Sequence, residues 1–261
     1  MGQLDGRVVL VSGGTQGVGA GVARAAAREG ADVVVTGRRP EVGEALVAEL
    51  RGLLAEGRAA HYVATDVADV ASARVSVAAV VERFGRVDGL VNAAGLTGRG
   101  TLLDTTPELF DAHVAVNLRG PFFLMQAAVA DMVRRGEPGA VVNVTSTSAH
   151  GGQPYLAPYV AAKAGLAGAT RNAAHAHRFD RVRINALNIG WTDTEGEDAT
   201  QRAFHGAGDD WRERAAQRLP MGRLGRVDEI ADVVVLLLSD RSGVVTGSVL
   251  DWDQNVLGGM D

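Results

Sequence analysis

Tyr159 and Lys163 stand four positions apart, in the segment Tyr159-Val160-Ala161-Ala162-Lys163. Residues at this spacing share one face of a helix, so the ammonium can lie beside the phenol. A nearby positive charge favours the phenolate and lowers a tyrosine pKa, which is ordinarily about 10. Lys163 is also the only lysine among the 26 Lys+Arg residues. The pair predicts a tyrosine that gives and takes a proton; a buried tyrosine beside a surface lysine is the alternative.

A glycine-rich segment follows the first apolar run of the chain and precedes an alanine-rich stretch. Glycines allow a tight turn and a close approach of the backbone to a pyrophosphate, and the N–H groups that open the following helix bind that anion. The pattern predicts a dinucleotide site because it lies between an expected strand and an expected helix. The residues expected to contact the cofactor are Gly13, Thr15, Gln16, Gly17, Val18 and Gly19.

The second expected strand ends in Gly37-Arg38-Arg39. A site for NAD usually has an acidic residue here, which binds the ribose hydroxyls. This chain has none, and a guanidinium suits the 2′-phosphate of NADP(H). Surface arginines unrelated to any ligand are the alternative, because arginine is abundant in this chain. The sequence therefore favours NADP(H), bound through Arg38 and Arg39, with NAD(H) as the second choice.

Short, valine-rich runs alternate with longer helical patterns along the chain. This alternation predicts a parallel sheet with helices on both faces, a Rossmann-type doubly wound sheet of about seven strands in a three-layer α/β/α fold. We expect one domain over residues 1–261. The expected strands are Arg7–Ser12, Asp32–Thr36, Ala59–Thr65, Val87–Asn92, Ala140–Thr145, Arg183–Leu187 and Ser248–Asp251. The expected helices are Val18–Glu29, Glu41–Glu56, Val70–Phe84, Pro107–Arg135, Pro158–Phe179 and Val227–Leu238.

One stretch, residues 191–226, departs from this pattern because it is polar, charged and contains glycine. It falls between a late strand and a late helix, at the sheet edge where α/β proteins bind ligands. We expect it to be a lid over the substrate, and a solvated surface excursion is the alternative. Its acidic residues favour a hydroxylated substrate such as a sugar or polyol; they are Asp193, Glu195, Glu197 and Asp198.

Composition excludes several classes of protein. A net charge of -5 argues against a nucleic-acid partner, which requires clustered positive charge. The absence of cysteine excludes disulfides, thiol nucleophiles and cysteine-ligated metals, and no metal site is predicted. The first apolar run is too short for a signal peptide or a membrane span. We therefore expect a cytoplasmic protein with no membrane partner.

Several motifs together resemble the short-chain dehydrogenase/reductase family, over about residues 4 to 255. The Tyr-x-x-x-Lys pair of the family falls on Tyr159 and Lys163, and its glycine turn falls on residues 12–19. Its serine, thirteen residues before the tyrosine, falls on Ser146, and its relay asparagine falls on Asn117. Further cofactor positions of the family fall on Asp66, Val67, Asn92, Ala93, Gly95, Ile189, Gly190, Thr192 and Thr194.

The sequence departs from the family pattern in two places. Ile189-Gly190 replaces a Pro-Gly pair in the nicotinamide loop, and Asp253-Gln254-Asn255 replaces an Asp-Gly-Gly turn near the C-terminus. We therefore expect the nicotinamide loop and the C-terminal contacts to differ from the family pattern.

The resemblance implies an oxidoreductase that passes hydride between nicotinamide and a carbonyl or alcohol. In reduction, Tyr159 would give a proton to the substrate oxygen, which Ser146 would hold. Lys163 would lower the Tyr159 pKa and bind the nicotinamide ribose, and Asn117 would hold a water that connects Lys163 to solvent. A non-catalytic NADP(H) sensor or scaffold, and an isomerase or dehydratase without net cofactor turnover, are the alternatives.

The assembly expected is a homotetramer, with a homodimer second. Members of the family commonly form tetramers through two long helices, and closed symmetric assemblies are usual for soluble oligomers. The two long helical patterns of this chain carry small apolar residues that allow close packing: Ala127, Ala128, Ala161, Ala164 and Ala167.

Overall fold

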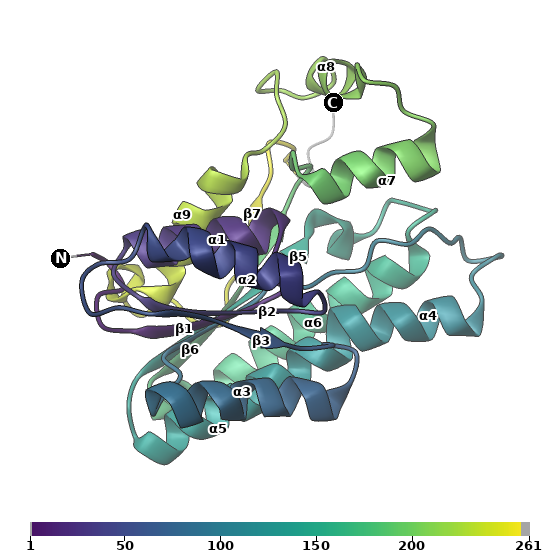
Figure 1. Ribbon diagram of the computed structural model, residues 1–261. Helices are drawn as coiled ribbons and strands as arrows, with labels where there is room; N and C mark the ends of the chain where they lie inside the picture. The colour runs from purple at the N-terminus through teal and green to yellow at the C-terminus, as the bar shows by residue number, and fades with distance from the viewer. Residues whose placement is uncertain (1, 257–261) are drawn as a thin grey trace.

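The structure, a computed structural model, describes residues 2–256 of the chain. Seven strands form one sheet, in the order β3-β2-β1-β4-β5-β6-β7 (Figure 1). All six neighbouring pairs are parallel. Because β1 lies inside this order, the chain begins within the sheet and later strands are added on both sides of it. The predicted Rossmann-type fold is confirmed. The strands are β1 Val8–Ser12, β2 Asp32–Gly37, β3 Ala60–Ala64, β4 Gly89–Asn92, β5 Gly139–Ser146, β6 Val182–Ile189 and β7 Val249–Trp252.

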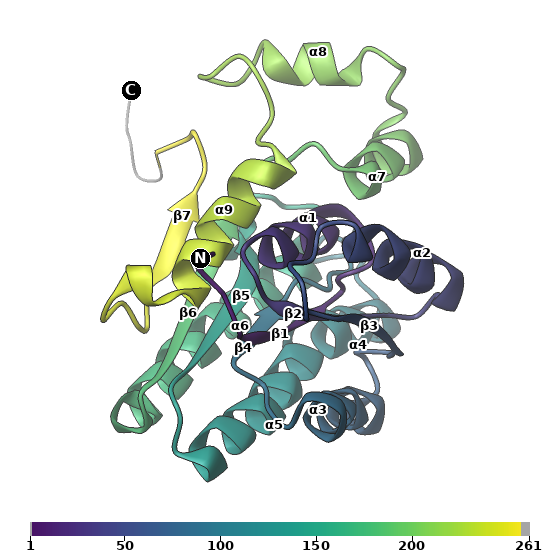
Figure 2. The same ribbon diagram turned by 60° about the vertical axis from the view of Figure 1, so that its left-hand side comes forward.

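Helices cover both faces of the sheet (Figures 1 and 2). Successive strand residues point to opposite faces, so β1 supplies Val9 and Val11 to one core and Val8 and Leu10 to the other. The first core lies under α1, α2 and α9, and the second under α3, α5 and α6. No helix in the described part of the chain has the length and apolar character needed to cross a membrane. The helices covering the sheet are α1 Gly17–Arg28, α2 Pro40–Arg51, α3 Val70–Phe84, α5 Gly120–Arg135, α6 Ala157–Ala176 and α9 Val227–Leu238.

The single helix predicted over Pro107–Arg135 is wrong as one continuous element. The segment forms α4 Pro107–Val114, a π-helical turn over Ala115–Arg119, and then α5. Pro121 has no N–H, so the carbonyl of Asn117, four residues earlier, lacks the donor that a regular α-helix would supply. Single π-turns of this kind occur frequently at functional sites.

The stretch over residues 191–226 folds into two helices, α7 Glu195–His205 and α8 Trp211–Ala216. Both lie beyond the carboxyl ends of the central strands (Figures 1 and 2). The Trp191 and Trp211 rings stack with centroids 6.2 Å apart, and Trp211 is buried with Ala215 and Leu224 in a small separate cluster. We call residues 191–226 the lid segment. It has a hydrophobic core of its own, which the sequence did not predict.

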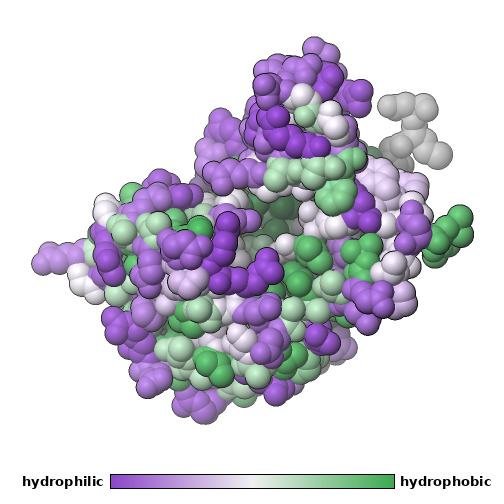
Figure 3. Space-filling model, turned by 45° about the vertical axis from the view of Figure 1, so that its right-hand side comes forward, coloured by the Kyte–Doolittle hydropathy of each residue, from purple (hydrophilic) through white to green (hydrophobic). Residues whose placement is uncertain are grey.

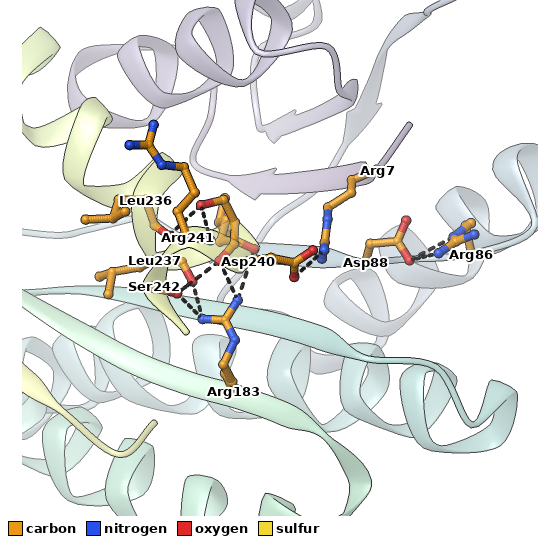
Figure 4. Close-up of polar contacts among 11 residues, drawn as sticks. Arg7, Arg86, Asp88, Arg183, Leu236, Leu237, Asp240, Arg241 and Ser242 are labelled. Carbon is orange, nitrogen blue, oxygen red and sulfur yellow. Dashed lines mark hydrogen bonds and ion pairs between the residues drawn. The ribbon is translucent and has the colours of Figure 1, made fainter. Parts of the chain in front are cut away.

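Arg183 on β6 joins the sheet to the end of α9 (Figure 4). Its guanidinium donates to the carbonyls of Leu237, Leu238 and Ser239 at 2.6, 3.2 and 2.9 Å, and to Ser242 Oγ at 2.6 Å. The last carbonyls of a helix have no partner within the helix, and a cation near them is favourable. One planar side chain therefore caps α9, although its burial lowers the arginine pKa.

We expect Arg183→Lys to lower the free energy of unfolding by about 1–3 kcal/mol, because an ammonium cannot reach all four acceptors and leaves buried carbonyls without donors. Urea unfolding at a fixed protein concentration measures the change. Arg241→Lys is the matched control, since Arg241 is an exposed neighbour. Equal unfolding midpoints for the two variants would contradict this role of Arg183.

Candidate active site

The residues singled out in the sequence collect at the carboxyl edge of the sheet, next to the lid segment (Figure 1). Figure 3 shows a hollow between this edge and the charged surface of the lid, with hydrophobic residues along its floor and lower rim. Ligands of open α/β sheets bind at this edge. The fold therefore places the predicted residues where a ligand can reach them.

The glycine-rich segment turns tightly between β1 and α1. Gly13 has a positive φ of 68°, and a Cβ there would lie 2.5 Å from the backbone of Ala94. A Cβ on Gly19 would lie 2.2 Å from the Gly13 carbonyl oxygen. Gln16 precedes α1 without a side-chain capping bond, and the first turn of the helix holds no acidic residue. The cradle thus requires glycine and leaves the start of α1 available to an anion.

Arg38 and Arg39 are both exposed beside this cradle. Arg39 Nη2 donates to Gln16 Oε1, which ties the end of β2 to the glycine segment. Arg38 forms no ion pair or side-chain hydrogen bond within residues 2–256. A Cβ on Gly37 would lie 2.8 Å from the Thr15 side chain, so the close packing of these loops also limits what can stand at position 37.

Asp66 and Asn92, both expected near the cofactor, differ in exposure and in the partners of their side chains. Asp66 is exposed, and its Oδ1 accepts from the backbone N–H of Ala68 at 3.0 Å. Asn92 is buried, and its Nδ2 donates to Asn143 Oδ1 on β5 at 2.8 Å. The Asn92 side chain is therefore turned into the sheet, and the following residues, Ala93 and Gly95, are the more exposed part of that loop.

Tyr159 and Lys163 lie on the first turns of α6, as their spacing predicts. Lys163 is only 4% exposed, its Nζ donates to the Val144 carbonyl at 2.9 Å, and the same nitrogen lies 5.7 Å from the centroid of the Tyr159 ring. Ser146, at the end of β5, lies close enough to act on the Tyr159 pKa, and its Oγ accepts from the Ser148 N–H at 3.1 Å. The structure thus brings Ser146, Tyr159 and Lys163 together.

The expected lowering of the Tyr159 pKa is wrong for this structure. Burial raises the pKa of Tyr159 to about 12 and outweighs the effect of Ser146, which favours the phenolate. Burial also lowers the pKa of Lys163 from 10.5 to about 8, because the ammonium is held among carbonyl and apolar groups. Near neutral pH the phenol of Tyr159 therefore keeps its proton.

Asn117 lies on the π-helical turn and is completely buried. Its Oδ1 accepts from the Leu96 N–H at 3.0 Å, and its Nδ2 donates to the Leu96 carbonyl at 2.9 Å and to His113 Nδ1 at 3.2 Å. Both amide protons are therefore in use. Its backbone carbonyl, which Pro121 leaves without a helical donor, offers a further acceptor at this position.

The two departures from the family pattern lie side by side, one at the end of β6 and the other directly after β7. Gly190 N donates to the Trp252 carbonyl at 2.9 Å, and a Cβ on Gly190 would lie 2.3 Å from Asp253 Oδ1. Thr192 Oγ1 donates back to the Gly190 carbonyl at 2.9 Å, while Thr194 caps α7 by accepting from the Glu197 N–H at 3.0 Å. The C-terminal strand thus closes directly against the loop of Ile189 and Gly190.

Sequence reasoning missed two residues at this site. Arg99, in the loop after β4, lies over the rings of Tyr155 and Phe204, each 5.5 Å away, and contacts His205 Nε2 at 3.2 Å. It links this loop to α7 of the lid segment. His113 is buried between Asn117 and Tyr159, with its ring centroid 6.1 Å from that of Tyr159. Its spacing of four residues before Asn117 is a signal that could have identified it.

Comparisons with known proteins agree with this geometry. The family model described as "Enoyl-(Acyl carrier protein) reductase", of the short-chain dehydrogenase/reductases, matches residues 13–256. The 3-oxoacyl-[acyl-carrier-protein] reductase of Thermotoga maritima is 36% identical, covering 96% of this chain and 98% of its own. L-Rhamnose 1-dehydrogenase (NAD(P)(+)) of Azotobacter vinelandii is 38% identical over 95% of both chains. The structure of actinorhodin polyketide ketoreductase with NADPH superposes with a TM-score of 0.89 at 32% identity, covering 97% of this chain and 98% of that one.

The matched region includes the glycines of the cradle, the Tyr159–Lys163 pair and strands β2 to β7. Relatives with these names reduce or oxidise carbon–oxygen groups with a nicotinamide cofactor. The chain belongs to the short-chain dehydrogenase/reductase family and is an NAD(P)-dependent oxidoreductase acting on CH–OH or C=O groups.

Proposed function

We propose that this protein is an NADP(H)-dependent oxidoreductase of carbonyls and secondary alcohols, with Tyr159 as the proton donor and acceptor. The arrangement of Ser146, Tyr159 and Lys163 at the carboxyl edge of β5 and the start of α6 carries the proposal. A sensor or scaffold on the same fold would have no need to bury a lysine beside a tyrosine, since such burial disfavours the charge.

The protein residues divide the work of proton transfer. Ser146 Oγ positions the substrate oxygen beside the phenol, and Tyr159 delivers the proton to that oxygen in reduction. Lys163 supplies positive charge beneath the ring and stabilises the phenolate that remains. A cofactor bound in the glycine cradle supplies or accepts the hydride. The backbone carbonyl of Asn117, which lacks a helical donor, is the acceptor for a water that replaces the proton, while both protons of the side-chain amide are engaged.

The cofactor proposal is supported by the fit of the cradle to a dinucleotide. Side chains at Gly13 or Gly19 would collide with the backbone of this turn, so only glycine allows its tight path, and α1 begins without a capping side chain. Arg38 and Arg39, exposed at the end of β2, are the residues that we propose to bind the 2′-phosphate of NADP(H). One structural relative is described with NADPH, which agrees with this choice.

The proposal of a hydroxylated substrate rests on relatives more than on the lid. Asp193 and Asp198 are paired with Arg212, and Glu197 accepts from Trp191 and Gln201, so these carboxylates are engaged within the lid segment. Two relatives named L-rhamnose 1-dehydrogenase favour a sugar. The relative named 3-oxoacyl-[acyl-carrier-protein] reductase favours an acyl ketone as the second candidate.

A panel of substrates tests the function directly. Purified protein is mixed with NADP(H) or NAD(H) and with aldoses, polyols, cyclic alcohols or 3-ketoacyl thioesters, and absorbance is followed at 340 nm. We expect a net, substrate-dependent change with at least one class. Product formation without any net change at 340 nm would instead identify an isomerase or dehydratase, and binding without either would identify a sensor.

We also propose a homotetramer. Ala161 and Ala164 are exposed on the outer face of α6, although Ala128 and Ala167 face the core instead. Phe110 on α4 and Phe122 on α5 are both exposed, and exposed apolar groups of this kind mark interaction surfaces. Light scattering at micromolar concentration should give four times the chain mass of 27.1 kDa. A mass of one chain would refute any assembly, and a mass of two would leave the homodimer.

A further inference from the structure

His113 has no part in the roles given above, yet it contacts two of the residues to which they are assigned. It lies on α4, four residues before Asn117, and its side chain is completely buried. Its Nδ1 lies 3.2 Å from Asn117 Nδ2, and its ring meets the Tyr159 ring edge-on, at 81° with centroids 6.1 Å apart. We propose that His113 is a positioning residue, a neutral imidazole that holds Asn117 and Tyr159 in one fixed arrangement. The proposal rests on the proposed function of these two residues.

The hydrogen bonds of Asn117 fix the tautomer of His113. The side-chain oxygen of Asn117 accepts from the Leu96 N–H, and its nitrogen donates to the Leu96 carbonyl. If the oxygen and nitrogen were exchanged, a donor would face the Leu96 N–H and an acceptor would face the Leu96 carbonyl. The nitrogen of the amide must therefore be Nδ2, which only donates. His113 Nδ1 accepts from it and carries no proton, and the proton of the neutral ring lies on Nε2.

The surroundings of His113 favour this neutral form. Its ring is enclosed by Asn117 from the π-helical turn, Tyr159 from α6 and the loop of Gly98 and Arg99 after β4. Burial is the largest cause that lowers the pKa of His113, and the positive charge of Arg99 lowers it further. No carboxylate is among the groups that act on this ring, and the hydrogen bond to the Gly98 backbone, which raises the pKa, is outweighed by burial.

The other side of the ring is closed by backbone. A Cβ on Gly98 would lie 3.2 Å from His113 Nε2, so the loop after β4 approaches this nitrogen closely. Leu96 in the same loop is held by Asn117. His113 is thus packed between the relay residue, the proton donor and the loop that precedes the cleft. A change in the ring would alter the placement of Asn117 and Tyr159 together.

A matched pair of variants separates the two contacts of the ring. His113→Phe keeps an aromatic ring against Tyr159 but leaves one Asn117 N–H without an acceptor, whereas His113→Gln keeps an acceptor and loses the ring. We expect His113→Phe to lower kcat roughly 10-fold with little change in KM, and to shift the pH profile of kcat, since one buried donor is left unpaired. His113→Gln should recover the pH profile. His175→Phe, at an exposed position on α6, is the control.

Nitrogen NMR of protein labelled with ¹⁵N-histidine tests the same inference without a substrate. The His113 signal is the one absent from the His113→Gln spectrum. We expect it to report the neutral Nε2–H tautomer throughout pH 6–8. An Nδ1–H tautomer, or a titration midpoint near 6.5, would overturn the inference whatever the substrate panel shows.

The two proposals can fail separately. Absence of turnover with every substrate class would defeat the proposed function and leave the tautomer measurement standing. Normal turnover in the parent protein, with an unchanged kcat and pH profile in a folded His113→Phe, would defeat only the role of His113.

Discussion

Replacing Tyr159 with phenylalanine should lower kcat by at least about 10²-fold, because the substrate oxygen loses its proton donor. Cofactor binding should persist, since the ring volume and its contacts with His113 and Lys163 are kept. Cofactor fluorescence measures binding, and absorbance at 340 nm measures turnover. Tyr155→Phe is the matched control, because Tyr155 is a partly exposed tyrosine near the same cleft that has no lysine four residues later.

The pH dependence gives a second test of the same assignment. The pKa of Tyr159 is about 12 and that of Lys163 about 8, so both groups hold their protons at neutral pH. Reduction should therefore vary little with pH below about 8 and fall above it, as the charge of Lys163 is lost. Near-normal turnover in Tyr159→Phe, or a reduction rate that rises above pH 8, would show that another group donates the proton.

The parent protein should bind NADPH roughly 10- to 100-fold more tightly than NADH. A charge-assisted hydrogen bond to a phosphate contributes about 1.5–3 kcal/mol, and each 1.4 kcal/mol corresponds to tenfold in affinity. Arg38 and Arg39 are exposed, so we expect the lower half of this range, and the preference should shrink as salt rises. Fluorescence titration of both reduced cofactors, at low and high salt, measures it.

Arg38→Leu is the variant that tests the cause of this preference. It removes a guanidinium that has no other partner within residues 2–256, whereas loss of Arg39 would also break the contact with Gln16. NADPH affinity should fall and NADH affinity should stay the same. Arg51→Leu, at the exposed end of α2, removes the same charge farther from the cradle. Combining Arg38→Leu with Gly37→Asp should reverse the preference only if Thr15 moves, because the new Cβ would crowd it.

Equal affinity for the two cofactors in the parent protein would mean that neither Arg38 nor Arg39 binds the 2′-phosphate. A preference that survives Arg38→Leu but disappears in Arg39→Leu would move the role to Arg39.

The sheet was predictable because its strands are buried on both faces and therefore appear as valine-rich runs between turns. The π-helical turn at Asn117 was not predictable, because the apolar pattern of the helix continues through it. Its only sign in the sequence is Pro121, which has no N–H to bond the Asn117 carbonyl. The helices of the lid were also missed. Their core depends on Trp191 meeting Trp211 twenty residues later, which a local pattern does not contain.

The site was predictable to the extent that spacing determines geometry. Tyr159 and Lys163 share a face of α6, and the glycine-rich turn leads directly into α1, as the two sequence patterns predict. The direction of the Tyr159 pKa shift was not predictable in the same way. The charge of Lys163 was expected to lower the Tyr159 pKa, but the depth of burial decides the sign, and burial follows from the packing of the whole chain.

The burial of Lys163 has a practical consequence for chemical labelling. Apart from the terminal amine, this side chain is the only primary amine in the protein, and it is almost closed to solvent. Amine-directed cross-linkers and dyes should therefore modify the side chains of the folded protein very little. Acylation of Lys163 requires a reagent to reach this buried amine, so the rate of labelling measures how accessible the side chain is in the folded protein.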